Sequence, residues 1–374
     1  MKVLLVTEVR IYVINDKYYA SESFSKILKR YHTKFGKITL LTRLIYTNQI
    51  PKGYKDITDY CIEFENSKSI IKSFLPFRKE NIKKLVCESD FIILRVPSII
   101  SISIYKYIRK FHKKYMTETM GCAWDAYWNH DFLGKIVALY GFVSMKKIVY
   151  NADYATYVTQ EFLQKRYPCK NKSIGVSNVS INEINYKRNY ENNPKKEITL
   201  LTAAAVDVRY KGQHLVIKAI SKIKKDKKID IKYYLAGSGN QEFLKRMAKK
   251  YNVSSNVVFL GNLSHNELLE LMKKIDIYIQ PSLQEGLPRS LIEAMSCGCV
   301  CLGATTAGIP ELLQKECLFK KGKSETIVIA INNIINKDWK QISEENLDKG
   351  SLYLENYLDE KRFKYYDYVI NSLY

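Results

Sequence analysis

Short apolar runs alternate with amphipathic segments through the second half of the chain. In the amphipathic segments apolar residues recur at helical spacing, as Leu215, Ala219 and Ile223 do. Ser264 and Glu267 have the spacing of a capping box, which predicts the start of another helix. Apolar strands that alternate with helices are typical of a parallel sheet with both faces covered. We therefore expect strands at residues 198–204, 231–236, 257–260, 275–280 and 300–303, and helices at 213–223, 241–250 and 288–296.

The first half of the chain has the same alternation in a less regular form. Between the halves, residues 184–196 are polar, contain Pro194 and have no periodicity, which is typical of a linker. We therefore expect Rossmann-like α/β domains at residues 1–183 and 197–350, followed by an aromatic helix at 351–374. Strands in the first domain are expected at residues 3–7, 38–42, 91–94, 115–118 and 155–159, with helices at 21–35 and 102–114.

The composition fits a large cytoplasmic protein. With 374 residues, 46% of them apolar, the chain can bury the cores of two domains. Its opening residues lack the apolar run of a signal peptide, and no stretch of about 18 apolar residues could span a membrane. The eight cysteines have no metal-site spacing, so we expect no bound metal.

The chain is strongly and unevenly basic, with a net charge of +22. Residues 1–182 contain 30 Lys/Arg against 15 Asp/Glu, whereas the rest of the chain contains 30 against 23. This excess favours an anionic partner such as lipid head groups, pyrophosphate or nucleic acid, and the alternative is a Lys-rich solvated surface. No helix-turn-helix, zinc or RNP motif is present, so we do not expect nucleic acid as the partner.

The run PSLQEGLPRSLIEAM at residues 281–295 contains two glutamates, Glu285 and Glu293, that flank seven residues. It resembles the donor-binding motif of the large retaining glycosyltransferase family four, and the resemblance is close over residues 198–313. Members of that family act in bacterial capsule, O-antigen and exopolysaccharide biosynthesis. The resemblance implies the GT-B fold, in which two Rossmann-like domains face each other across a cleft and the C-terminal helix, here residues 351–374, crosses back to the first domain. It also implies transfer of a sugar from a nucleotide-diphosphate sugar to an acceptor, with retention of configuration and without a metal ion.

The chemistry of this run fits the resemblance. Glu285 is expected in a loop just before a helix that begins near Pro288, where a carboxylate accepts charge-strengthened hydrogen bonds from sugar hydroxyls. The backbone amides of Gly286 and Leu287 lie near the helix N-terminus, where a diphosphate binds readily. By resemblance, Glu285 holds the donor sugar and Glu293 holds the ribose hydroxyls. The alternative is an ordinary surface helix with two glutamates.

Two cations form a second candidate cluster at the end of a predicted strand. Arg209 and Lys211 can neutralise a departing diphosphate, which is the charge that a sugar transfer must stabilise. The family usually has an arginine five residues before the lysine, where this chain has Val206. We therefore carry over Lys211 from the family and take Arg209 as the substitute cation. The alternative is a pair of solvated loop charges.

Three glycines complete the predicted donor site. Gly237 and Gly239 follow a strand and resemble the family's Gly-x-Gly turn under the nucleotide. Gly308 resembles a residue of another donor-side loop, where the backbone would approach the ligand closely.

The first domain departs from the family pattern, because its first strand is not followed by a glycine-rich loop. Asp16 and Tyr18 lie in that segment and are candidates for the acceptor site, with a plain loop or hairpin as the alternative. Arg95 is a further acceptor candidate at a strand end. Family members place a histidine beside the transferring sugar, and here either Glu118, at a strand end, or His130 could act there.

Residues 102–115 predict an amphipathic basic helix. Ile104, Ile108 and Phe111 share its apolar face, and its charges are Lys106, Arg109, Lys110, Lys113 and Lys114. Such a helix suits peripheral contact with an anionic inner leaflet, and the alternative is that its apolar residues are plain core. The expected partners are a nucleotide-sugar donor and a saccharide acceptor that is free or linked to undecaprenyl, and no cofactor is expected. Other classes that fit are a sugar-nucleotide epimerase of the same architecture and a non-catalytic binding protein.

Overall fold

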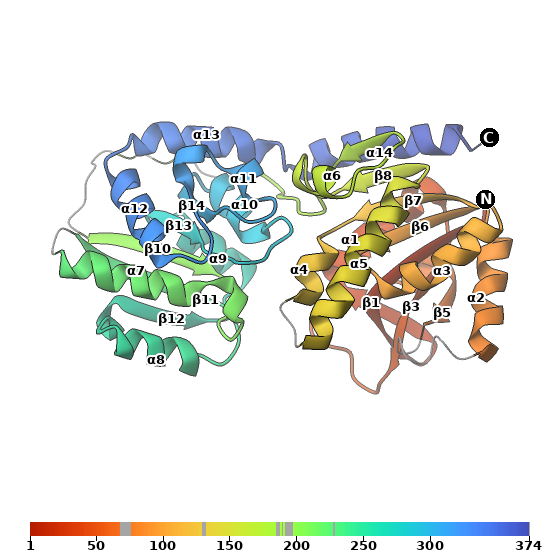
Figure 1. The fold of residues 1–374 in the computed structure, drawn as a ribbon, viewed down its shortest axis with the longest axis horizontal. Helices are drawn as coiled ribbons and strands as arrows, with labels where there is room; N and C mark the ends of the chain where they lie inside the picture. Colours follow the sequence, from red (N-terminus) through yellow and green to blue (C-terminus); the bar gives the residue numbers. More distant parts are fainter. Residues whose placement is uncertain are drawn as a thin grey trace. The chain divides into compact units, whose positions relative to one another are not determined.

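The structure is a computed structural model that describes the chain except residues 68–75, 129–131, 185–187, 189, 191–196, 227–228 and 374. For residues 76–79, 126–128 and 132–137 it describes the backbone alone. The chain divides into two compact units (Figure 1). The first contains Met1–Asn178 and Glu360–Tyr374, and the second contains Val179–Asp359.

The first unit is built on a mixed sheet. Its strands are β1 (Val3–Ile14), β2 (Lys17–Ser21), β3 (Ile38–Tyr46), β4 (Tyr54–Asp56), β5 (Cys61–Asn66), β6 (Phe91–Val96), β7 (Lys114–Thr119), β8 (Tyr154–Tyr157) and β9 (Ser173–Gly175). Strands β5-β3-β1-β6-β7-β8-β9 pair in parallel, whereas β2 and β4 add antiparallel pairs beside β1. Its helices are α1 (Glu22–Phe35), α2 (Pro76–Glu88), α3 (Ile99–Lys110), α4 (Ala123–Trp128), α5 (Phe132–Tyr150) and α6 (Phe162–Arg166), and α14 (Glu355–Asn371) joins it from Glu360 onward.

Alternation along β1 explains how this sheet is covered on both faces. Val3 and Leu5 belong to a core with side chains of α1 and α14, whereas Leu4 and Val6 belong to a core with side chains of α2, α3 and α5. Successive strand residues point to opposite faces, so a continuous apolar run fills two cores at once. From α14, Tyr366 packs in the first core, with its ring centroid 5.6 Å from that of Tyr31. The C-terminal helix therefore packs on the first unit, as the sequence predicts.

The second unit contains a sheet in which all described pairings are parallel, in the order β12-β11-β10-β13-β14-β15. The strands are β10 (Glu197–Ala203), β11 (Asp230–Ala236), β12 (Val257–Gly261), β13 (Ile277–Gln280), β14 (Val300–Ala304) and β15 (Leu318–Phe319). The helices are α7 (Gln213–Lys225), α8 (Glu242–Lys250), α9 (His265–Met272), α10 (Arg289–Ser296), α11 (Ile309–Leu312), α12 (Ser324–Ile335) and α13 (Trp339–Ser351). Both bonds of the capping box are present at α9, between Ser264 and Glu267.

The α/β architecture predicted from the sequence is confirmed, but two elements of the first unit differ. Strand β1 continues to Ile14 instead of ending at Thr7, and its register with β3 shifts between Val6 and Arg10. Helix α3 ends at Lys110, four residues before the predicted end, because the segment from Lys114 pairs with β6 as strand β7. Most of the predicted linker lies outside the described residues.

Candidate active site

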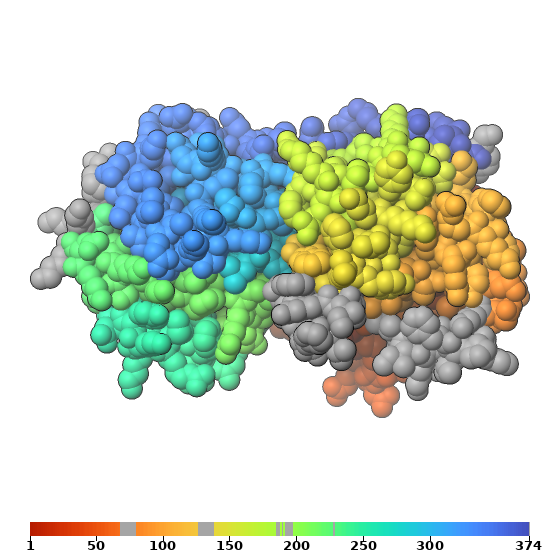
Figure 2. Space-filling model, in the orientation of Figure 1, coloured from red at the N-terminus to blue at the C-terminus, as the bar shows by residue number. Residues whose placement is uncertain are grey.

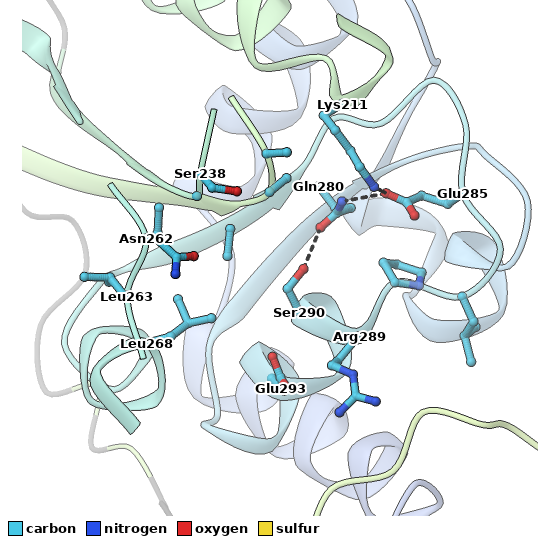
Figure 3. A pocket seen from close by; sticks show the side chains of 17 residues that line it. Lys211, Ser238, Asn262, Leu263, Leu268, Gln280, Glu285, Arg289, Ser290 and Glu293 are labelled. Atoms are coloured by element: carbon cyan, nitrogen blue, oxygen red, sulfur yellow. Dashed lines mark hydrogen bonds and ion pairs between the residues drawn. The ribbon is translucent and has the colours of Figure 1, made fainter. Parts of the chain in front are cut away.

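A cavity of about 420 Å³ lies at the carboxyl edge of the parallel sheet in the second unit. Residues that follow β10, β11, β12 and β13 border it, together with the first turns of α10 (Figure 3). This is the edge at which open α/β sheets bind their ligands. The polar side chains that line the cavity are those of Lys211, Ser238, Asn262, Gln280, Glu285, Arg289, Ser290 and Glu293.

Two glycines allow the loops around this cavity to approach one another. A Cβ on Gly237 would lie 2.0 Å from the carbonyl oxygen of Ala204, so no side chain fits in the turn after β11. A Cβ on Gly212 would lie 2.0 Å from the carbonyl oxygen of Pro281, and Gly212 also has a φ of 78°. Only glycine adopts that conformation without strain. Gly212 therefore lets the loop that carries Lys211 approach the loop that carries Glu285.

Lys211 and Glu285 form an ion pair at the cavity wall, and Figure 3 shows the two side chains pointing toward each other. The Lys211 Nζ atom lies 2.7 Å from Glu285 Oε1. The same oxygen accepts hydrogen bonds from Ser282 Oγ at 2.8 Å and from Gln280 Nε2 at 3.1 Å. The side chains of Lys211 and Glu285 are 22% and 11% exposed, so water and small ligands still reach the pair.

The buried side chain of Gln280 fixes the orientation of this carboxylate. Its Oε1 atom accepts a hydrogen bond from the Tyr278 hydroxyl at 2.7 Å, and the Ser290 hydroxyl lies 3.4 Å away. Because Oε1 accepts these hydroxyls, the amide nitrogen is directed toward Ser282 and Glu285. The cavity wall is thus a connected polar network that holds Glu285 in one position.

Glu293 lies one turn into α10 and is almost fully buried, although it lines the cavity. Burial raises the pKa of its carboxyl group, and the charges of His265 and Arg289 oppose that shift. The His265 Nδ1 atom is 3.6 Å from Glu293 Oε1. A buried carboxylate with a free approach from one side is suited to accept hydrogen bonds from a ligand's hydroxyl groups.

The first turn of α10 faces the same cavity. Pro288 is the N-cap residue and no side chain caps this end, which leaves the first amides of the helix for an anion. Arg289 is the first residue of the helix and is among the residues that line the cavity (Figure 3). Together with Lys211, it provides two cations beside an uncapped helix N-terminus.

The structure brings only part of the predicted donor residues into the cavity lining. Lys211, Gly237, Glu285, Leu287 and Glu293 line it. The remaining predicted donor residues, which are Gly239, Gly286, Gly308 and Arg209, are not among its lining residues.

Three of these outer residues, which are Gly286, Gly308 and Arg209, have clear structural contacts. The amide of Gly308 donates to the carbonyl of Gly286 at 3.0 Å, which ties together the two predicted donor loops. Arg209 is exposed, and its guanidinium lies 4.7 Å from the ring centroid of Phe243 on α8. Arg209 is thus outside the cavity lining, in which Arg289 is the second cation beside Lys211, and contact of Arg209 with a donor stays a prediction.

In the first unit, Glu118 and Arg95 form a second ion pair, which is sealed inside the fold. Arg95 Nε and the Tyr31 hydroxyl both donate to Glu118 Oε2, at 2.5 and 2.8 Å, and Asn178 Nδ2 donates to Oε1. The side chains of Arg95 and Glu118 are only 4% and 6% exposed. Burial alone would raise the pKa of Glu118, but Arg95 and the donated hydrogen bonds lower it overall. Contact of Glu118 or Arg95 with a substrate stays a prediction, and the observed contacts give both residues a structural role.

The acceptor candidates Asp16 and Tyr18 belong to a β-hairpin. Asn15 and Asp16 connect β1 to β2 with φ values of 47° and 57°, the backbone geometry of a tight two-residue turn. Tyr18 stacks on Phe64 with ring centroids 3.7 Å apart. The segment is thus a hairpin, which is the alternative to an acceptor site that the sequence analysis named. A role of Asp16 and Tyr18 in an acceptor site stays a prediction. The remaining candidate, His130, lies outside the described residues.

A carboxylate occupies the region where the family has its glycine-rich loop. Glu8 lies in β1, and its Oε1 atom accepts the backbone amides of Ile99, at 2.5 Å, and Ile100, at 3.3 Å, at the start of α3. Its other oxygen accepts a hydrogen bond from Arg43 Nη2 at 2.8 Å. This helix N-terminus is therefore occupied by the protein's own anion.

Four residues that were not predicted from the sequence also line the cavity, namely Asn262, Arg289, Gln280 and Ser290. A signal for Asn262 and Gln280 exists, since each lies at or directly after the end of a parallel strand. Arg289 and Ser290 lie inside the recognised motif, at the position where its helix begins. Among the residues that the structure describes, no group of three His, Cys, Asp or Glu could hold a metal ion. Within the same residues, no helix is long and apolar enough to cross a bilayer.

Comparisons with known proteins bear on this site. Residues 183–350 match the family model of glycosyl transferases group 1. Protein CapJ of Staphylococcus aureus is 32% identical over all of this chain and 98% of its own length. Sucrose-phosphate synthase of Thermosynechococcus elongatus superposes with a TM-score of 0.70 at 15% identity, over 99% of both chains. Anabaena HepE in complex with UDP superposes with a TM-score of 0.65 at 14% identity, over 97% of this chain and 99% of that one.

These matches define the class of the protein. The solved structures share its GT-B fold of two Rossmann-like domains. The chain belongs to the group 1 glycosyltransferases, whose family model matches residues 183–350, and it is similar to CapJ over its full length.

Proposed function

We propose that this glycosyltransferase binds a nucleotide-diphosphate sugar in the second-unit cavity and transfers the sugar with retention of configuration, without a metal ion or other cofactor. The observation that carries the proposal is the convergence of the Lys211–Glu285 pair, Glu293 and the uncapped first turn of α10 on one cavity. Two cations, a helix N-terminus and two carboxylates match the parts of such a donor, which are a diphosphate, a ribose and a sugar.

Each group has a role that its chemistry supports. The diphosphate lies against the first turn of α10, with Lys211 and Arg289 beside it, because both the helix N-terminus and the cations favour a dianion. Glu293 accepts hydrogen bonds from the ribose hydroxyls. Glu285, held by Gln280 and Ser282, accepts hydrogen bonds from the donor sugar. Binding of the donor then gives Lys211 a phosphate partner in addition to Glu285.

The chemical step requires stabilisation of the departing nucleoside diphosphate. As the bond from the anomeric carbon to the phosphate oxygen breaks, negative charge develops on that oxygen, and Lys211 and the α10 amides oppose it. The acceptor hydroxyl attacks from the same face and passes its proton to the leaving phosphate. This route needs no enzymic general base. Glu118 then acts through the fold of the first unit, where it is held by Arg95, Tyr31 and Asn178.

The acceptor is a saccharide, and we favour one linked to undecaprenyl pyrophosphate or a related lipid in the assembly of a capsule, O-antigen or exopolysaccharide. The resemblance of residues 198–313 to family four and the basic first half of the chain support this assignment. The reaction then takes place on the cytoplasmic face of the membrane.

A panel of nucleotide sugars, each incubated with the protein and analysed by mass spectrometry, tests the proposal. We expect one donor to be consumed only when an acceptor saccharide is added. Conversion of a nucleotide sugar to its epimer without an acceptor would identify an epimerase instead. Activity that is lost with EDTA and restored by Mn²⁺ or Mg²⁺ would overturn the metal-free mechanism.

A further inference from the structure

The solvent-facing side of α5 carries a cluster of large apolar side chains in the first unit. Leu139, Tyr140, Val143 and Tyr150 are among the exposed large apolar residues of the protein. At about 100° per residue they fall within an arc of about 120° on the helix, together with the exposed Lys146 and Lys147. Figure 2 shows this helix in yellow on the face toward the viewer, beside α3 in orange.

The apolar run of α5, like the basic helix of residues 102–115, was a candidate for membrane contact from the sequence, but the structure separates the two. The apolar side of α3 is core, because Ile104 and Ile108 are buried against the sheet. Lys114 lies in β7, and its Nζ atom is 3.1 Å from Asp153 Oδ1. The exposed apolar residues therefore come from α5, and α3 contributes the cations Lys106, Arg109 and Lys110.

A groove of about 750 Å³ lies between α2, α3 and α5 and joins the two sets of residues. Its charged lining residues are Lys106, Arg109 and Lys147, and Tyr107 and Tyr140 add aromatic sides. None of the described residues that line the groove is acidic, and neither Ile99–Lys110 nor Phe132–Tyr150 contains an Asp or Glu in its sequence. This surface is therefore positively charged, and it is complementary to an anionic ligand that can lie beside apolar residues.

We propose that α5 and the α3–α5 groove form a docking surface for an anionic phospholipid bilayer. Leu139, Val143 and the tyrosine rings enter the head-group and upper acyl region, as in helices that lie in a membrane interface. Tyrosine suits this depth because its ring is apolar and its hydroxyl stays hydrated. Lipid phosphates occupy the groove, where the guanidinium and ammonium groups of Lys106, Arg109 and Lys147 neutralise them.

Charge reversal tests the groove against a matched control elsewhere in the chain. The variant Lys106→Glu, Arg109→Glu, Lys147→Glu is compared with Arg246→Glu, Lys249→Glu, Lys250→Glu on α8, whose three residues are also exposed cations of the same types. Flotation uses the full chain with phosphatidylglycerol–phosphatidylcholine vesicles and with pure phosphatidylcholine vesicles. We expect the groove variant to bind the anionic vesicles about 100-fold more weakly than the unmodified protein, and the α8 variant to bind nearly normally.

A fluorescence measurement tests the apolar part of the surface. Val143 and Ile329 are both 57% exposed, Val143 on α5 and Ile329 on α12 of the second unit. Anionic vesicles should shift the emission of Val143→Trp to shorter wavelength, because the indole enters the interface, and should leave Ile329→Trp unchanged.

Three outcomes overturn the proposal. The first is equal binding of the unmodified protein to both vesicle types, and the second is an equal loss of vesicle binding in the groove and α8 variants. The third is an emission spectrum of Val143→Trp that anionic vesicles do not shift. Preferential binding of the same surface to an acidic soluble polysaccharide would assign the groove to that ligand instead. Donor binding is measured on each variant by calorimetry, so failure of membrane docking with intact donor binding leaves the proposed catalytic function standing.

Discussion

The two units each contain a carboxylate paired with a cation, and the pairs differ in their access to solvent. Lys211 and Glu285 line a cavity with side chains 22% and 11% exposed, whereas Arg95 and Glu118 are 4% and 6% exposed inside the first unit. Each carboxylate accepts three hydrogen bonds from the protein, but only the Lys211–Glu285 pair lines a cavity in which a ligand can reach it. The same pair of charges therefore suits ligand binding in one unit and structural support in the other.

The largest effect is expected from breaking the sealed pair. Arg95→Ala leaves the Glu118 carboxylate buried without its cation, which should lower the free energy of unfolding by about 3–5 kcal/mol. Lys211→Ala breaks the accessible pair and should lower it far less. Chemical denaturation of both variants measures the difference. The double variant Arg95→Leu, Glu118→Leu is a control that should recover much of the loss, and equal losses for Arg95→Ala and Lys211→Ala would remove the contrast between the pairs.

We expect Lys211→Ala to have a large effect on catalysis, in contrast to its small effect on stability. Lys211→Ala should reduce kcat by about 10²–10³-fold, since its charge is needed where the diphosphate departs. A folded Lys211→Ala protein with normal turnover would exclude this role. Steady-state kinetics with the donor found in the panel provide the measurement, and the thermal midpoint checks that the variant is folded.

The variant Glu293→Gln tests whether the cavity binds the ribose of the donor through this carboxylate. The amide keeps the size of the side chain but loses the charge that strengthens its hydrogen bonds to the ribose, which should weaken donor binding by about 1–3 kcal/mol. Isothermal titration calorimetry with the nucleoside diphosphate measures this directly. Unchanged affinity would place the ribose elsewhere.

Two arginines of the second unit provide a matched comparison of position. Arg289 borders the cavity and Arg209 lies over Phe243 outside it. Arg289→Ala should weaken binding of the diphosphate by about tenfold, whereas Arg209→Ala should change it little. If the two substitutions had reversed effects, Arg209 would be the second cation of the donor site, as predicted from the sequence.

The smallest effect concerns pH. The pKa of Glu118 is lowered in the folded protein, so its charged form stabilises the fold above its usual pKa of 4.5, and this contribution is lost as pH falls through the lower folded value. The free energy of unfolding of the unmodified protein should therefore decrease below about pH 4.5 more steeply than that of Glu118→Gln. Parallel pH dependences would mean that this carboxylate does not contribute.

The sequence predicted which residues of the second unit line one cavity better than it predicted the contacts of the first unit. Glu285, Glu293, Lys211 and Gly237 follow short-range patterns, namely a strand end, a loop and the first turns of a helix, so their sequence spacing determines where they lie. Arg209 was predicted to act there because it precedes Lys211 by two residues; in the structure its guanidinium lies over Phe243 and it is not among the residues that line the cavity.

The contacts of the first unit were harder to predict because they join residues that are far apart in the sequence. Glu118 meets Tyr31 and Asn178, which are 87 and 60 residues away, and no local pattern predicts that three donors would enclose it. The hydrophobic pattern of residues 102–115 was interpreted as a surface helix, although an amphipathic helix has the same pattern when its apolar side covers a sheet. Only the packing of α3 and α5 distinguishes the two cases.

The proposed donor site is tested by a crystal structure of the protein with the nucleoside diphosphate of the donor that the panel identifies. We expect the diphosphate within about 3.5 Å of Lys211 Nζ and of the first amides of α10, with the ribose hydroxyls at Glu293. A diphosphate bound elsewhere, with Lys211 still paired to Glu285 alone, would contradict it.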